Sequence, residues 1–135
     1  VACEAACGAR PRVEIFGTDY KTSDGTGIRD YIHVEDLARA HLDAIAYLDR
    51  GGVSQILNCG YGHGFSVREV LSIVKKVSGV NFEVVESARR PGDSPAVVSE
   101  ASRIGNILGW KPQYDDLEII CRTAYEWERK LRSKV

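Results

Sequence analysis

The sequence has no apolar run long enough to cross a membrane and no block of basic residues. A membrane-spanning helix needs about 20 consecutive apolar residues, and no stretch here approaches that length. The 18 lysines and arginines are balanced by 19 acidic residues, which gives a net charge of -1. Nucleic acids and anionic membranes bind cationic surfaces, so we expect neither as a partner. The start VACEAACGAR also lacks the basic and apolar segments of a signal peptide, so we expect a cytoplasmic protein.

The sequence also lacks the spacing of a metal site or a disulfide framework. Its four cysteines have no zinc-ribbon pattern, and its three histidines do not form ligand pairs with them. Such thiols are typical of small, partly buried side chains in a reducing compartment. We therefore expect no bound metal and no disulfide.

Alternating strand-like and helix-like patterns predict an α/β fold. A chain of 135 residues, 44% of them hydrophobic, can bury the core of one domain. Residues 1–6 are small and apolar and precede Gly8, which predicts the last turns of a helix. Because that helix has no cap, we expect residues 1–10 to be the tail of a helix from a missing N-terminal part. Strands are predicted at 12–16, 28–32, 55–59 and 81–85, and helices at 33–49, 66–78, 99–108 and from 115 onwards.

One stretch, from Gly25 to Val34, carries groups suited to a ligand. Glycines at 25 and 27 allow backbone conformations that side chains forbid, so we expect a loop that leads into a strand. Residues two apart on a strand share a face, which would place Arg29 beside Tyr31. Arg29 would offer a planar donor fork to a phosphate, and Tyr31 an aromatic ring with a hydroxyl. The alternative is a surface ion pair between Arg29 and Asp30 next to an ordinary packed tyrosine.

A second charged turn lies at 88–93, in the sequence ARRPGD. Two arginines, a Pro-Gly turn and an aspartate can present cations and a carboxylate from one loop. This combination suits a diphosphate together with a ribose or sugar hydroxyl. The alternative is a solvated surface turn.

A glycine-rich turn at 60–64, GYGHG, lies between a predicted strand and a predicted helix. Glu86 follows about twenty residues later, as the acidic residue does in a dinucleotide-binding unit. The spacing is nevertheless not G-x-G-x-x-G, and Ser66 is predicted to cap the helix where a pyrophosphate would bind. We interpret the turn as structural, with a true NAD site as the less favoured alternative.

The string DYKTSDGTGIRDYIHVEDLARAHLDAI, at 19–45, closely resembles a stretch of UDP-glucose 4-epimerases, members of the extended short-chain dehydrogenase/reductase family. The resemblance covers roughly residues 12 to 132. It includes RRPGD at 89–93, which resembles the loop that closes over UDP, and Asn58 with Gly60, which match the family's asparagine-x-glycine turn. Cys59 stands where leucine is usual, a departure that affects packing only. The resemblance implies the C-terminal substrate-binding part of such an enzyme, with an incomplete Rossmann-type sheet.

The same resemblance implies a UDP-sugar site in a C-terminal domain at 11–135. Arg29 would bind the diphosphate, and Tyr31 would line the nucleotide pocket. Glu14, Ile15 and Phe16 would border the uracil. The implied ligands are UDP-glucose and UDP-galactose.

In the second loop, the resemblance implies that Arg90 and Asp93 grip the diphosphate and the ribose. The family's NAD would be bound by the missing N-terminal domain rather than by this chain. The parent enzyme is expected to be a homodimer.

The family reaction needs groups that this sequence does not contain. Members transfer a hydride from C4 of the sugar to NAD and back, with a tyrosine base and a lysine in Y-x-x-x-K. None of the six tyrosines has a lysine four residues later, and neither G-x-x-G-x-x-G nor G-x-G-x-x-G occurs. We therefore expect no catalytic residue here: the chain alone should be inactive, whereas its full-length parent would epimerise UDP-glucose. Two alternatives stay open, namely part of another nucleotide-sugar epimerase, dehydratase or decarboxylase, and a non-catalytic module that binds nucleotide sugars.

Overall fold

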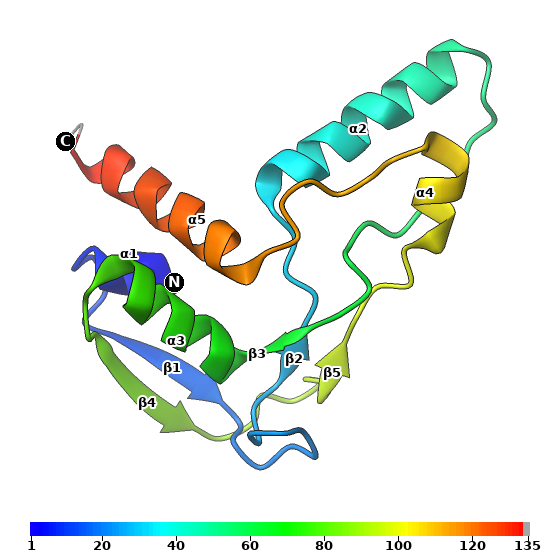
Figure 1. The fold of residues 1–135 in the computed structure, drawn as a ribbon. Coiled ribbons are helices and arrows are strands. Elements are labelled where there is room, and N and C mark those ends of the chain that lie inside the picture. The colour runs from blue at the N-terminus through cyan, green and yellow to red at the C-terminus, as the bar shows by residue number, and fades with distance from the viewer. Residues whose placement is uncertain (134–135) are drawn as a thin grey trace.

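The computed structural model describes residues 1–133, within which helices and short strands alternate (Figure 1). The helices are α1 (Ala2–Ala6), α2 (Val34–Asp49), α3 (Val67–Ser78), α4 (Ser102–Leu108) and α5 (Leu117–Arg132). The strands are β1 (Arg12–Phe16), β2 (Ile28–Arg29), β3 (Phe65–Ser66), β4 (Glu83–Ser87) and β5 (Ala96–Val97). This order confirms the predicted α/β class.

The strands form two small sheets. β1 pairs in parallel with β4, with Arg12 opposite Glu83. In the second sheet β2 lies between β3 and β5, antiparallel to β3 and parallel to β5. The pairing of β2 with β5 sets Arg29 opposite Val97, only a few residues beyond Asp93. The sheet therefore brings the two predicted ligand-binding loops close together.

The main core lies where α1, α3 and α5 gather beside the β1–β4 pair (Figure 1). Along β1, Val13 and Ile15 are buried, and the residues that alternate with them are exposed, as expected of a half-buried strand. Ala5 and Ala6 of α1 belong to the same core. The boundary between 1–10 and 11–135 stays a prediction, although α1 packs within this core.

A second cluster joins α2 to α4 around Ala40, Ile104 and Trp110. Figure 1 shows these two helices as an arm that projects away from the lobe of α1, α3 and α5. Between the arm and the lobe lies the small sheet of β2, β3 and β5. The arm contacts the rest of the protein mainly near the start of α2.

The structure corrects three strand predictions. Residues 55–59 form no strand, because no other strand in the described range 1–133 offers them a hydrogen-bonding edge. The strand at Arg29 ends there, since Asp30 turns its carboxylate to backbone N–H groups and the chain enters α2 at Val34. Tyr31 is thus not on a pleated face with Arg29. β4 occupies 83–87 rather than 81–85, because its pairing with β1 sets the register.

Side-chain caps begin two helices as predicted. In the capping box of α3, Ser66 Oγ accepts from the Glu69 N–H at 3.1 Å, and Glu69 Oε2 accepts from the Ser66 N–H at 2.6 Å. His33 precedes α2, where its Nδ1 accepts from the Glu35 N–H at 3.1 Å. The cap predicted at Ser66 is therefore confirmed, and His33 makes a structural hydrogen bond at the start of α2.

The last two helices, α4 and α5, differ in whether a side chain caps their first turn. Asp116 caps α5 by accepting from the Ile119 N–H at 3.0 Å, as the acidic pattern predicts. Ser99 does not cap α4, which begins three residues later without a side-chain cap. The Ser99 N–H instead donates to the Asp30 carboxylate at 3.2 Å, a tertiary contact that the local pattern could not indicate.

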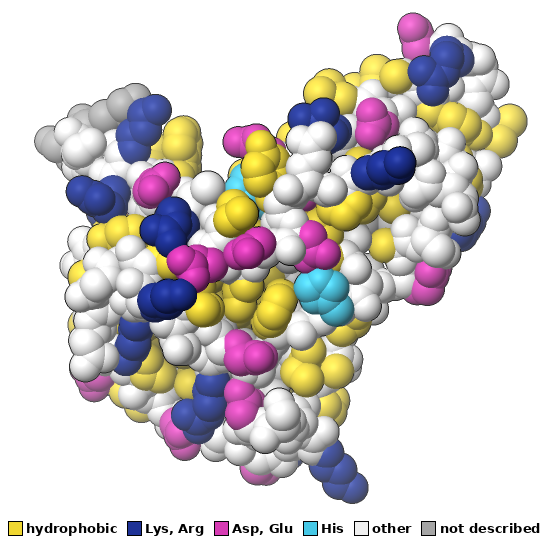
Figure 2. Space-filling model, in the orientation of Figure 1, with side chains coloured by type: hydrophobic (Ala, Val, Ile, Leu, Met, Phe, Trp, Pro, Cys, Tyr) yellow, Lys and Arg dark blue, Asp and Glu magenta, His cyan; other side chains and the backbone are white. Residues whose placement is uncertain are grey.

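The apolar stripe of α2 faces solvent. Leu42, Ile45 and Leu48 are 66%, 63% and 52% exposed, and Val53 and Ile56 extend the apolar surface. Figure 2 shows hydrophobic side chains along this arm. His41 and Trp127 are also exposed, whereas Trp110 is buried. An amphipathic helix needs a partner for its apolar face, and residues 1–133 supply none here. Over the same residues, no helix has both the length and the apolarity to span a bilayer.

Candidate nucleotide-sugar site

A cavity of about 420 Å³ lies beside β1. Its walls come from β1, from β2 and Tyr31, from the first turns of α3 and from the loop at 88–93. Six predicted site residues line it: Glu14, Phe16, Arg29, Tyr31, Arg90 and Asp93. The other walls are mainly apolar, with Val1, Ala2, Val13, Val67, Val70 and Leu71. Apolar walls with a few convergent polar groups are typical of small-molecule sites.

Arg29 folds back across Gly27 within the cavity. Its Nη1 donates to the Ile28 carbonyl at 2.7 Å, and a Cβ on residue 27 would lie 3.2 Å from that nitrogen. Gly25 is needed for a different reason: its φ is +82°, and a Cβ there would lie 2.1 Å from the Thr18 carbonyl oxygen. The two glycines thus shape the loop and leave room for the guanidinium. The alternative ion pair of Arg29 with its neighbouring aspartate is not formed within the described chain.

Arg90 and Asp93 form another part of the cavity wall. The Arg90 guanidinium lies over the Phe16 ring, with its Cζ 4.8 Å from the ring centroid. Its Nε donates to Asp93 Oδ2 at 2.9 Å. The two side chains are 59% and 24% exposed, and ion pairs of this kind contribute little to stability. A phosphate can therefore take the place of the carboxylate on this arginine.

The remaining predicted residues differ in their placement. Tyr31 is half-buried, and burial raises the pKa of its phenol more than the neighbouring Arg29 lowers it. Its hydroxyl is therefore protonated at neutral pH and able to donate. Glu14 accepts from Ser87 Oγ at 3.3 Å. Ile15 does not line the cavity, because its side chain is only 2% exposed and belongs to the core.

The charges of the cavity nearly cancel. Arg29 and Arg90 contribute two positive charges, while Glu14 and Asp93 contribute two negative ones. A simple anion would meet no strong net field here. A ligand that joins a diphosphate to hydroxyl groups can use both the cations and the carboxylates.

The glycine-rich turn at 60–64 is occupied by an internal contact. The Asp30 carboxylate accepts from the N–H of Tyr61 at 3.0 Å and from that of Gly62 at 3.1 Å. A Cβ on Gly60 would lie 2.4 Å from Asp30 Oδ2, so glycine is required there. A pyrophosphate would need these same N–H groups. Glu86 is held by Arg68 in an ion pair, so these residues do not fit an NAD site, and the structural interpretation holds.

A second carboxylate, that of Asp36, is fully buried and holds Tyr61 and the segment before α5. Its oxygens accept from the Tyr61 hydroxyl at 2.6 Å and from the N–H groups of Gln113 and Tyr114 at 2.9 Å. Burial raises the pKa of Asp36, but these hydrogen bonds outweigh it and hold the pKa below its ordinary value. Burial and the bond to Asp36 in turn raise the pKa of Tyr61. Asp36 thus acts as a fixed, ionised support for the turn.

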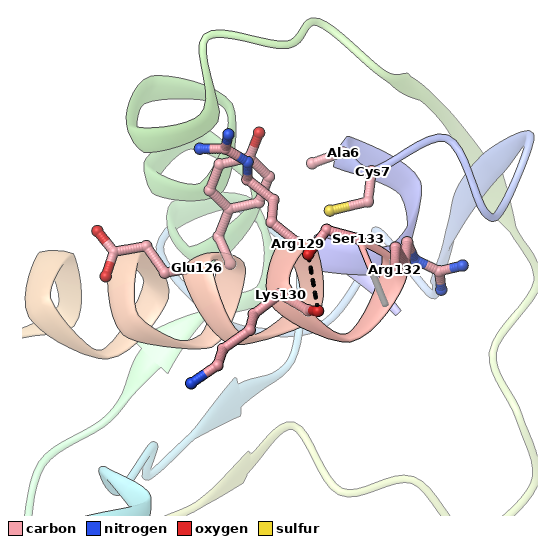
Figure 3. A pocket seen from close by; sticks show the side chains of 8 residues that line it. Ala6, Cys7, Glu126, Arg129, Lys130, Arg132 and Ser133 are labelled. Atoms are coloured by element: carbon pink, nitrogen blue, oxygen red, sulfur yellow. Dashed lines mark hydrogen bonds between the residues drawn. The ribbon is translucent and has the colours of Figure 1, made fainter. Parts of the chain in front are cut away.

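A larger hollow of about 540 Å³ lies between the ends of α1 and α5, away from these loops. Figure 3 shows Glu126, Lys130 and Arg132 on α5 with their side chains pointing in different directions. The interaction drawn there joins Ser133 Oγ to the Lys130 carbonyl at 3.0 Å. Because these charges diverge, the hollow gathers no group of side chains around one point.

The structure adds one residue that sequence reasoning missed. Tyr20 lies in a turn-rich segment that predicts a surface loop, yet it is only 6% exposed and lines the cavity. The signal available in the sequence was an aromatic residue inside an otherwise polar turn. Its position beside Arg89 depends on a contact between segments some seventy residues apart, which no local pattern encodes.

Comparison with known proteins first gives a similarity to one class of enzyme. Residues 3–60 match the family described as NAD dependent epimerase/dehydratase family. The α/β fold of the chain agrees with this match.

Within that class, the chain is similar over its length to the C-terminal portion of UDP-glucose 4-epimerases, as the sequence predicts. It is 54% identical over 135 residues to the UDP-glucose 4-epimerase of Azospirillum brasilense, covering 100% of this chain and 39% of that protein. It is 43% identical over 127 residues to that of Lacticaseibacillus casei, covering 94% and 38%. The chain therefore spans about two fifths of the length of the curated relatives it matches.

Solved structures show the same similarity to UDP-glucose 4-epimerases. The UDP-glucose-4-epimerase of Stenotrophomonas maltophila, with bound NAD and formylated UDP-arabinopyranose, superimposes with a TM-score of 0.92 at 39% identity, covering 99% of this chain and 40% of that chain. The enzyme of Bifidobacterium longum, in complex with NAD+ and UDP, gives a TM-score of 0.87 at 34% identity, covering 99% and 39%. These likenesses confirm the predicted fold class, an incomplete part of an extended short-chain dehydrogenase/reductase.

Proposed function

We propose that this chain is the UDP-sugar-binding part of a UDP-glucose 4-epimerase, which interconverts UDP-glucose and UDP-galactose. The observation that carries the proposal is the convergence of Arg29 and Arg90 on one cavity, although 61 positions separate them in the sequence. Two guanidinium groups facing one space suit a diphosphate, which offers several anionic oxygens.

The proposed contacts follow the walls of the cavity. Arg29 and Arg90 bind the diphosphate, and Asp93 accepts from ribose hydroxyls. Glu14 and Phe16 border the uracil, with Ile15 contributing through its backbone only, because its side chain is in the core. Tyr31 lines the nucleotide pocket and can donate through its protonated hydroxyl.

Titration with UDP tests this site. The wild-type chain should bind UDP in the micromolar range, and Arg29→Ala should weaken binding at least about tenfold, since a charge-assisted hydrogen bond contributes about 1.5–3 kcal/mol. Isothermal calorimetry gives both affinities. Arg39→Ala, on the exposed side of α2, is the matched control and should leave the affinity unchanged. Equal affinities for wild type and Arg29→Ala would contradict the proposal.

We further propose that NAD and the catalytic tyrosine–lysine pair belong to the remainder of the parent protein. The Asp30-bound glycine turn and the absence of Y-x-x-x-K support this division. The chain alone should then show no conversion of UDP-galactose in the presence of NAD, measured by coupled detection of UDP-glucose. Sustained turnover by the chain alone would overturn this part. The homodimeric parent and the cytoplasmic location stay predictions from the sequence.

A second candidate concerns the sugar. The UDP-Glc/GlcNAc 4-epimerase of Campylobacter jejuni is 53% identical to this chain, with a TM-score of 0.87 over 96% of this chain and 39% of that chain. Acceptance of N-acetylated UDP-sugars by the parent is therefore the rival specificity. Turnover of UDP-glucose, UDP-N-acetylglucosamine and UDP-glucuronate by the full-length parent separates it from the leading proposal and from other nucleotide-sugar enzymes.

A further inference from the structure

The Tyr20 hydroxyl is unusual among the polar groups of this protein. Of the buried side-chain nitrogen and oxygen atoms in residues 1–133, it alone has no hydrogen-bond partner. Burying such a group unpaired is unfavourable, and a phenylalanine would fill the same space without the penalty. Tyr61, in contrast, donates its hydroxyl to Asp36 at 2.6 Å and accepts from the His33 N–H at 3.1 Å. The fold is thus able to satisfy a tyrosine hydroxyl, and at Tyr20 it does not.

The Tyr20 ring is fixed from several sides. Its backbone N–H donates to the Gly25 carbonyl at 2.9 Å. The Arg89 guanidinium lies over the ring, with its Cζ 4.2 Å from the centroid. Gly17 approaches the ring so closely that a Cβ there would lie 2.5 Å from Tyr20 Cε2. The side chain is therefore held at the cavity wall rather than placed there by chance.

The cavity that the ring lines is the one that gathers Arg29, Arg90 and Asp93. Tyr20, which carries the unpaired hydroxyl, and the ligand-binding candidates therefore line one cavity. Arg89 covers the ring, is 45% exposed and is held by Asp19 at 2.6 Å. An exposed pair of this kind rearranges readily, which gives an incoming ligand access to the hydroxyl.

We propose that the Tyr20 hydroxyl donates a hydrogen bond to a charged phosphate oxygen of a nucleoside diphosphate bound in this cavity. The inference rests on the proposed function above and adds a contact to that site. The two arginines provide charge, whereas the phenol provides an uncharged donor in a fixed position. The partner missing from the protein is thereby supplied by the ligand.

Tyr20→Phe tests the proposal in a UDP titration of the chain by calorimetry. We expect affinity to fall about tenfold, the loss of one hydrogen bond to a charged acceptor. The melting temperature should stay the same or rise, because the variant removes an unpaired buried hydroxyl. Tyr47→Phe, which removes a phenol hydroxyl from α2 outside the cavity, should leave UDP affinity unchanged.

The outcomes separate the inference from the proposed function. If wild type binds UDP and Tyr20→Phe binds equally well, the inference is overturned and the proposed site stands. A lower melting temperature with unchanged affinity also overturns it, since the hydroxyl would then serve the fold. If wild type does not bind UDP at all, the proposed site and this contact both fail.

Discussion

At the residue scale, two carboxylates do most to organise the site. Asp30 and Asp36 are six positions apart, and each accepts hydrogen bonds from backbone N–H groups that are distant in sequence. Asp30 ties the turn at 60–62 to Ser99, close to the end of β5. Asp36 ties Tyr61 to the segment before α5. The loops of the cavity are therefore aligned by two aspartate side chains that do not line it.

Asp36→Asn should lower the free energy of unfolding by about 2–4 kcal/mol at pH 7, because backbone donors lose their charged acceptor. The pKa of Asp36 is lowered in the folded state, so its contribution is fully present above the unfolded pKa of about 3.9 and is lost as the pH falls through the folded value. Urea denaturation between pH 2 and about 6 measures both effects. Asp49→Asn, at the exposed end of α2, is the control. An unchanged pH profile in Asp36→Asn would refute this role.

Arg90→Lys keeps the charge but removes the planar fork and its stacking on Phe16. We expect UDP affinity to fall about fivefold or more, with little change in the melting temperature, because the side chain is 59% exposed. Calorimetric titration of both proteins gives the ratio. Arg103→Lys, on exposed α4, should bind UDP as wild type does. Wild-type affinity in Arg90→Lys would mean that charge alone suffices.

At the element scale, the start of α3 joins local capping to tertiary structure. Ser66 belongs to the capping box of α3 and to β3, which pairs with β2. Its Oγ also donates to Asp24 Oδ2 at 2.5 Å, which holds the loop before Arg29 against this helix. Ser66 thus caps its own helix and also positions one wall of the cavity.

Ser66→Ala should lower the free energy of unfolding by about 2 kcal/mol, since both the cap and the bond to Asp24 are lost. Chemical denaturation followed by circular dichroism gives the value. Ser72→Ala, exposed in the interior of α3, should be neutral or slightly stabilising because alanine is the better helix former. A loss no larger than that of the control would contradict the dual role.

At the scale of the whole molecule, the arm of α2 and α4 exposes an apolar surface that includes Leu42, Ile45 and Ile56 (Figure 2). Surfaces of this kind promote association. We expect the chain to self-associate as its concentration rises, and Leu42→Glu with Ile45→Glu to reduce this without lowering the melting temperature. Sedimentation velocity measures the effect. Trp127→Glu, on α5, should change association less. Equal association of wild type and the double variant would show that this surface is not responsible.

The sequence alone determined the local features of the protein. The caps at His33, Ser66 and Asp116 and the turn at Gly79 rest on contacts between near neighbours, so their residue types indicate the helix ends directly. The alternation of polar and apolar residues along β1 also indicated a strand directly, because successive side chains of a strand point to opposite faces. The charged loops also drew attention to Arg29 and Arg90, because their residue types suit a diphosphate.

Only the tertiary structure decided how these parts meet. The pairing of β2 with β5 brings the two arginine loops to one cavity, and β-pairing between distant segments leaves no trace in either segment alone. Residues 55–59 have the composition of a strand, but within residues 1–133 no strand edge lies beside them and no surface covers the apolar stripe of α2. Tyr20 became a cavity residue through Arg89 and Gly17, which contact it across the fold. Whether a residue is buried and which strand it pairs with depend on two segments that meet in the fold. The sequence of one segment specifies only its own secondary-structure preference and its side chains.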